Sequence, residues 1–144
     1  MAEAHEAIRN LLGRYCELVD AGDWPGLGEL FSDARLCDEA GTPWATGRDE
    51  VIASWEKRTQ MYDGSPRTRH LTVNPIIEVD DAGGTATARA AYVVFQATDA
   101  LPLQPVITGR YRDTFARDAT AEWRFTERRY SVDQAGDLSH HLLG

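Results

Sequence analysis

Apolar residues recur at helical spacing through the first part of the chain. One face of a predicted helix over residues 4–21 carries Ile8, Leu11, Leu12, Tyr15, Leu18 and Val19. Gly22 supplies the stop, and Asp23 can cap a second short helix over Trp24–Phe31. A third helix opens at residues 47–50, and its inner face carries Val51, Ile52, Trp55 and Tyr62. The pattern therefore predicts three helices before the break at residues 63–66.

From Thr68 onward the pattern changes to the alternation that is typical of strands. Four long strands are predicted over Thr68–Val79, Thr85–Thr98, Val106–Arg117 and Glu122–Val132. Residues 80–84 carry a hairpin turn signal, and short extended pieces are expected over Ala34–Glu39 and around Trp44. This order predicts an α+β fold whose three N-terminal helices pack on the concave face of a strongly curved, mostly antiparallel sheet. Ligands lodge in such concavities.

Length and composition fit one domain. The 144 residues allow a single domain, which we place at residues 1–133, with a polar C-terminal tail over 134–144. The formal net charge of −8 argues against nucleic acid and against anionic membranes as partners. No apolar run approaches membrane-spanning length, and the first residues do not resemble a signal peptide. With only Cys16 and Cys37 and no CxxC motif, a reduced cytoplasm is the expected location.

The stretch from Arg67 to Pro75 carries an unusual row of polar side chains. Alternation places His70, Thr72 and Asn74 on one strand face, and a polar row is costly to bury without partners. Two interpretations stay open at this point. The strand either lines a pocket with His70 as an acid or base, or it is a solvated face or holds a core histidine satisfied by one hydrogen bond.

Two residues of the first helix also stand out. Asp20 lies in its last turn at the edge of the apolar stripe, where the helix dipole disfavours a carboxylate. This position indicates either a functional acid or a solvated boundary residue. Tyr15 lies within the stripe and is either a core residue or a pocket hydroxyl. No His/Glu pair has ligand spacing on one helix, and His140 and His141 adjoin in a tail expected to be exposed. We therefore expect neither a metal nor an organic cofactor.

Several local patterns match a known family. They are residues 8–24, Leu30-Phe31, Gly47-Arg48, residues 69–74, residues 109–111 and residues 123–129. In these the chain resembles the SnoaL-like branch of the nuclear transport factor 2-like superfamily, which implies a cone-shaped α+β barrel. Within that branch the pattern is most similar to scytalone dehydratase, bile-acid 7α-dehydratase and hexachlorocyclohexane dehydrochlorinase.

The resemblance implies roles for individual residues. His70 falls on the position of a catalytic base, Asp20 on that of the aspartate that orients it, and Tyr15 on that of a tyrosine that polarises a substrate oxygen. An arginine of the last strand is implied at Arg128, or at Arg129 if the register differs by one. No equivalent is found for the second pocket histidine of scytalone dehydratase. Further substrate contacts are expected from Asn74, Trp55, Tyr62 and Tyr92.

These expectations define a function to test. The trio would support a cofactor-free lyase or isomerase that eliminates water or halide from a small, largely apolar cyclic substrate in an internal cavity. The alternatives are a polyketide cyclase and a non-catalytic ligand-binding or structural subunit, because this fold hosts all of these functions. A homodimer or homotrimer is expected, since the outer sheet face carries apolar positions.

Overall fold

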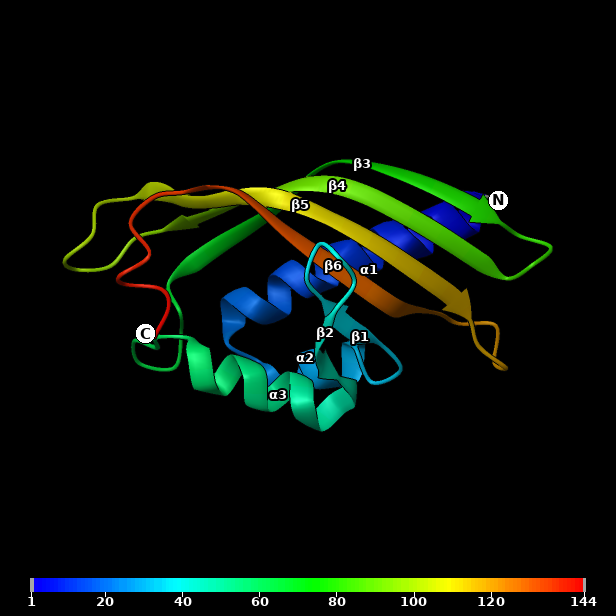
Figure 1. The fold of residues 1–144 in the computed structure, drawn as a ribbon, viewed down its shortest axis with the longest axis horizontal. Coiled ribbons are helices and arrows are strands. Elements are labelled where there is room, and N and C mark those ends of the chain that lie inside the picture. Colours follow the sequence, from blue (N-terminus) through cyan, green and yellow to red (C-terminus); the bar gives the residue numbers. More distant parts are fainter. Residues whose placement is uncertain (1, 144) are drawn as a thin grey trace.

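The computed structural model describes residues 2–143, and in this part of the chain it contains three helices and six strands (Figure 1). The helices are α1 (Ala2–Ala21), α2 (Trp24–Leu30) and α3 (Gly47–Arg58). The strands are β1 (Arg35–Cys37), β2 (Pro43–Thr46), β3 (Thr68–Asp80), β4 (Thr85–Gln96), β5 (Gln104–Arg117) and β6 (Trp123–Ala135). The element order matches the prediction from the sequence.

All six strands form one sheet in the order β2-β1-β6-β5-β4-β3. The neighbouring strands run antiparallel except for the parallel pair β1 and β6. The four long strands arch over the three helices (Figure 1). The predicted α+β class and the curved, mostly antiparallel sheet are confirmed. The cone is open, because β2 and β3 form the two edges of the sheet and do not pair with each other.

The core lies between the helices and the concave face of the sheet. The predicted inner face of α1 is buried at Ile8, Leu12, Tyr15 and Val19. From the sheet side, Phe115 and Phe125 pack into the same cluster. Burying an aliphatic or aromatic side chain of this size stabilises the fold by about 1.5–3 kcal/mol. This packing fixes α1 against the sheet, and with it the position of every side chain on its inner face.

Two local features differ from the sequence prediction. Helix α3 ends at Arg58 because Thr59 adopts an extended conformation and pairs with Leu142, so Tyr62 does not continue its inner face. In β3 the alternation is broken by a bulge between Val73 and Ile76, where Asn74 has a positive φ of 53°. A bulge adds a residue and shifts the facing of its neighbours. Asn74 is exposed in consequence.

The C-terminal segment packs back onto the fold. Strand β6 runs to Ala135, beyond the boundary predicted at residue 133, and the chain then turns toward the end of α3 (Figure 1). The backbone N–H of Gln60 donates to the carbonyl of His141, and that of Leu143 donates to the carbonyl of Arg58. The exposure expected for His141 is wrong, since its side chain is buried. None of the helices within residues 2–143 is long and apolar enough to span a membrane.

Candidate active site

A cavity of about 300 Å³ opens between α1, α3, the sheet and the C-terminal segment. Its volume lies at the lower end of the range for small-molecule sites. Six of the residues in its wall are aromatic, namely Tyr15, Trp44, Trp55, Tyr92, Tyr111 and Tyr130. The wall also contains the ionisable side chains of His70, His141, Arg58 and Asp38, together with Thr59, Val94, Ile107, Val132 and Leu142. A largely apolar cavity with a few polar groups suits a small, largely apolar ligand.

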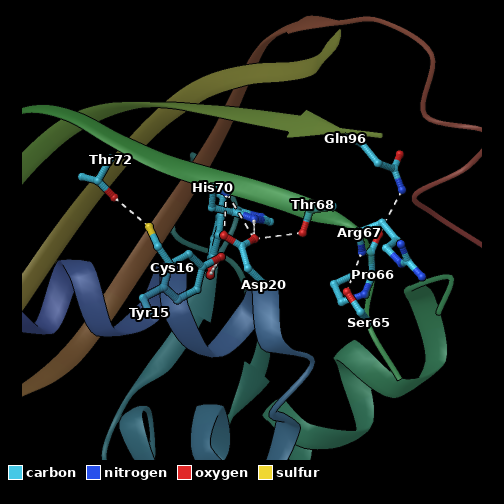
Figure 2. Close-up of polar contacts among 11 residues, drawn as sticks. Tyr15, Cys16, Asp20, Ser65, Pro66, Arg67, Thr68, His70, Thr72 and Gln96 are labelled. Carbon is cyan, nitrogen blue, oxygen red and sulfur yellow. Dashed lines mark hydrogen bonds and ion pairs between the residues drawn. The ribbon is translucent and has the colours of Figure 1, made fainter. Parts of the chain in front are cut away.

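The structure brings Asp20 into contact with His70, which lines this cavity. Asp20 Oδ1 lies 2.6 Å from His70 Nδ1 (Figure 2). The same carboxylate accepts hydrogen bonds from the backbone N–H of His70 at 2.9 Å and from Thr68 Oγ1 at 2.9 Å. A carboxylate that accepts several hydrogen bonds cannot rotate freely, so it holds the imidazole ring in one orientation. Its contact engages Nδ1, and Nε2 is the ring nitrogen that Asp20 does not bind.

The position of Asp20 follows from the end of α1. The helix stops at Ala21, and Gly22 takes the left-handed conformation with φ of 69°. Asp20 in the last turn therefore reaches the adjacent strand β3, where Thr68 and His70 point toward it (Figure 2). The geometry predicted for Asp20 and His70 from the sequence is present.

Tyr15 lines the cavity one turn and a residue before Asp20. Its ring meets that of His70 edge-on, with 6.2 Å between the centroids. The hydroxyl of Tyr130 donates a hydrogen bond of 3.3 Å to Tyr15 Oη. Burial raises the pKa of Tyr15 against the attraction of the Arg128 charge. Tyr15 therefore stays a neutral phenol near pH 7 and keeps a proton with which it can donate a hydrogen bond.

Two of the predicted substrate contacts, Trp55 and Tyr92, lie in the cavity wall. Trp55 packs beside Trp44 with 5.8 Å between the ring centroids. The Tyr92 hydroxyl is already engaged, since it donates to the carbonyl of Ser131 at 3.0 Å. Burial raises the pKa of Tyr92 to about 12. The residue beneath its ring must be Gly109, because an added Cβ there would lie 2.5 Å from Tyr92 Oη.

Three other predicted contacts are corrected by the structure. Asn74 is exposed on the bulge of β3, and Tyr62 lies beyond α3, so neither is part of the cavity wall. Arg128 is fully buried beneath the wall, where it forms two hydrogen bonds of 2.7 and 2.9 Å with Asp113. Its guanidinium lies 3.7 Å from the ring centroid of Tyr111. Arg129 pairs with Glu127 and does not line the cavity either.

His141 is one of several cavity residues that were not predicted from the sequence, and it is the one closest in kind to His70. It lines the cavity, and its ring centroid lies 6.3 Å from that of His70. The one signal in the sequence was the apolar pair Leu142-Leu143 at the end of a polar tail. This pair indicated that the tail could pack on the fold, but not that His141 would line a cavity. Among residues 2–143, no three His, Cys, Asp or Glu side chains form a group that could hold a metal ion.

Burial of His141 has a consequence for stability. Burial and the nearby His70 lower the pKa of His141 from 6.5 to about 4, while Asp20 acts in the opposite direction. Between these values the unfolded chain binds a proton that the folded protein does not, so stability falls as the pH is lowered through this window. The expected loss is on the order of 2–3 kcal/mol between about pH 7.5 and about pH 4.5. Urea unfolding at both pH values measures it.

The neighbouring histidine provides the control for that measurement. His141→Gln is expected to make the acid loss of stability shallower, whereas His140→Gln keeps it, because the side chain of His140 lies outside the cavity. Equal pH dependence in the wild type and His141→Gln would show that His141 is solvated in the folded protein.

The profile of the SnoaL-like domain matches residues 1–129. The chain belongs to the SnoaL-like family. A relative of this SnoaL-like protein is the beta subunit of the methanesulfonate monooxygenase hydroxylase of Methylosulfonomonas methylovora, which is 28% identical over 88% of the chain and 78% of the relative. The family predicted from the residue patterns is thereby confirmed.

Solved structures give the same fold. An NTF2-like protein with a cystatin-like fold from Novosphingobium aromaticivorans is 26% identical, with a TM-score of 0.75 over 96% of this chain and 87% of that one. A candidate scytalone dehydratase from the same organism is 22% identical, with a TM-score of 0.73 over 94% of this chain and 88% of that one. The likeness to the dehydratase candidate shows a shared fold alone.

Proposed function

We propose that the protein is a cofactor-free lyase or isomerase that removes a proton beside a carbonyl group of a small, largely apolar cyclic substrate. The observation that supports this proposal is the 2.6 Å contact of Asp20 with His70, a residue that lines a cavity rich in aromatic side chains. In this arrangement one ring nitrogen of the histidine is hydrogen-bonded to a carboxylate and the other can accept a proton, as in a general base.

The proposed reaction of a β-hydroxy ketone has two steps. His70 Nε2 takes the proton from the carbon beside the carbonyl, the C–H electron pair forms a C=C bond, and the carbonyl oxygen becomes an enolate. The enolate then reforms its C=O bond, a new C=C bond forms toward the next carbon, and the C–O bond of the hydroxyl breaks. The leaving hydroxide takes the proton back from His70. The products are an enone and water. From a β,γ-unsaturated ketone the same first step would give a dienolate, and return of the proton from His70 to its γ-carbon would give the conjugated isomer instead.

Asp20 and Tyr15 assist the first step in this proposal. Asp20 accepts the hydrogen bond of His70 Nδ1–H, which selects the tautomer of the neutral ring whose Nε2 is the acceptor and stabilises the imidazolium when it forms. Tyr15 donates a hydrogen bond to a substrate oxygen, where negative charge develops. Such proton transfer by a positioned side chain contributes typically ~10²–10⁴-fold to a rate.

The test is hydrogen exchange beside the carbonyl of cyclic ketones such as 1-tetralone in D₂O, followed by proton NMR. The wild type is expected to accelerate the exchange, and His70→Ala is expected to lose the acceleration while melting cooperatively. No acceleration over a panel of cyclic ketones, or a His70→Ala variant as fast as the wild type, would contradict the proposal.

A second candidate function follows from the beta-subunit relative, which is named as part of a larger hydroxylase. A purely structural subunit would assemble through its surface and would not need the dyad. Such a protein would bind a larger partner chain equally well with and without His70→Ala. The homodimer or homotrimer expected from the sequence stays a prediction, which light scattering on the purified protein checks.

A further inference from the structure

Three side chains hold the C-terminal segment, residues 139–142, over the cavity. Gln60 Nε2 donates to two backbone carbonyls of this segment, at 2.6 and 2.8 Å. The carbonyl of His140 accepts from Tyr62 Oη at 2.6 Å and from Gln96 Nε2 at 2.9 Å. These donors come from the chain after α3 and from the end of β4. The segment is therefore fixed to two separate parts of the fold, next to the residue it presents to the cavity.

That residue is His141, and its ring is unusual in being buried without hydrogen bonds. Its side chain is 9% exposed, and Nδ1 is buried with no hydrogen-bond partner. Leaving a buried polar atom unsatisfied is unfavourable, and a core histidine is normally bonded at least once. Because Nδ1 is closed off, Nε2 is the nitrogen that a ligand in the cavity can reach. We assign the ring proton to Nε2, where an acceptor can be met.

The charge state of His141 suits contact with a neutral carbonyl. Burial and the facing His70 lower its pKa to about 4, while Asp20 on α1 acts in the opposite direction. Arg58 lies in the same cavity wall and carries a permanent positive charge. His141 is therefore neutral near pH 7 and carries one N–H donor. A neutral imidazole can donate a hydrogen bond that polarises a carbonyl and stabilises the enolate, and it stays neutral while doing so.

We propose that His141 binds the substrate's carbonyl oxygen through its Nε2–H while His70 takes the proton from the adjacent carbon, and that Tyr62 is a positioning residue for His141. This proposal rests on the proposed function and names its substrate class, a small cyclic ketone. The centroids of the two rings are 6.3 Å apart. A small ketone between them can therefore present its carbonyl oxygen to His141 and the adjacent carbon to His70. The C-terminal segment thus completes the site.

The first experiment measures binding and needs no turnover. Dissociation constants are determined for 1-tetralone and for tetralin, which has the same two rings without the oxygen. In the wild type the oxygen should contribute a hydrogen bond, worth about 5–10-fold in affinity. His141→Phe is expected to lower the preference for 1-tetralone over tetralin by that factor. His140→Phe, the control next in sequence, should retain it. His141→Gln retains an N–H donor and should recover part of it.

Exchange kinetics provide the second readout. His141→Phe should lower kcat for hydrogen exchange by ~10–100-fold, with a smaller change in KM, because the enolate oxygen is stabilised most in the transition state. Tyr62→Phe should weaken the preference for 1-tetralone in the wild type and have no effect in the His141→Phe background. An effect of equal size in both backgrounds would mean that Tyr62 acts through general stability.

The outcomes separate the two proposals. If His70→Ala exchanges ketone protons as fast as the wild type, the proposed function fails, and the binding preference still decides the role of His141. If His70 is required but His141→Phe and His141→Gln both keep the full preference for 1-tetralone, the role of His141 is overturned. A wild type that binds neither ring compound, or binds them with a preference that no His141 variant changes, overturns it as well.

Discussion

Asp20→Asn is expected to slow hydrogen exchange of a cyclic ketone by ~10²–10⁴-fold while the protein remains folded. The asparagine oxygen can still accept from Thr68 Oγ1 or from the backbone N–H of His70, which now bond to the carboxylate. The amide nitrogen would then face His70 Nδ1 as a donor and move the ring proton to Nε2. A protonated Nε2 cannot act as the base, so the loss should appear in kcat rather than in KM.

The matched control lies one turn earlier on the same helix. Glu17 is an exposed carboxylate of α1 with the same change available, Glu17→Gln, and it does not line the cavity. Exchange by Glu17→Gln should equal that of the wild type. If Asp20→Asn also exchanged at the wild-type rate, the carboxylate would have no part in orienting His70.

The contact between Asp20 and His70 was predictable from two periodicities and one resemblance. Helical spacing placed Asp20 at the edge of the apolar stripe of α1, and alternation placed His70 on the same face of β3 as Thr72. Neither pattern contains the pairing itself, since the residues are 50 positions apart. The family resemblance supplied that step. The structure adds the third donor, Thr68, which a pattern of apolar positions does not reveal.

Alternation alone failed where strands carry bulges. The pattern grouped Asn74 with His70, but the bulge between Val73 and Ile76 changes the facing of every residue after it. A second bulge between Thr114 and Phe115 sets the register of β6 against β5. That register decides that Arg128 points inward. Because the sequence does not show the register, it could not distinguish Arg128 from Arg129.

The docking of the C-terminal segment was also beyond sequence patterns. It depends on amide and hydroxyl side chains that donate to backbone carbonyls, namely Gln60, Tyr62 and Gln96. A side chain that donates to a backbone carbonyl can do so at any residue type, so the spacing of residues in the sequence does not predict such a hydrogen bond. The same feature explains why His141 lies in the cavity wall and why Tyr62 does not lie on α3. Once α3 ends at Arg58, the chain that follows it pairs with the C-terminal segment.

The buried pair of Arg128 and Asp113 should dominate the stability of the fold. Arg128 is 0% exposed and Asp113 2% exposed, and two hydrogen bonds join them. Removing one partner leaves the other charge buried and unpaired, which is expected to cost about 3–5 kcal/mol in the free energy of unfolding. Arg128→Met and Asp113→Leu should each show this loss in urea unfolding. The arginine also packs on the rings of Tyr15 and Tyr111, so Arg128→Met removes those contacts too.

The double variant separates the pair from its surroundings. If the loss arises from an unpaired charge, Arg128→Met with Asp113→Leu should be more stable than the sum of the two single losses predicts, because neither charge remains. Arg110→Met is the control, since Arg110 pairs with Asp133 at an exposed position of the same two strands and should cost about 0–1 kcal/mol. Strictly additive losses would show that Arg128 and Asp113 stabilise the fold independently, through packing on the tyrosines rather than through their charges.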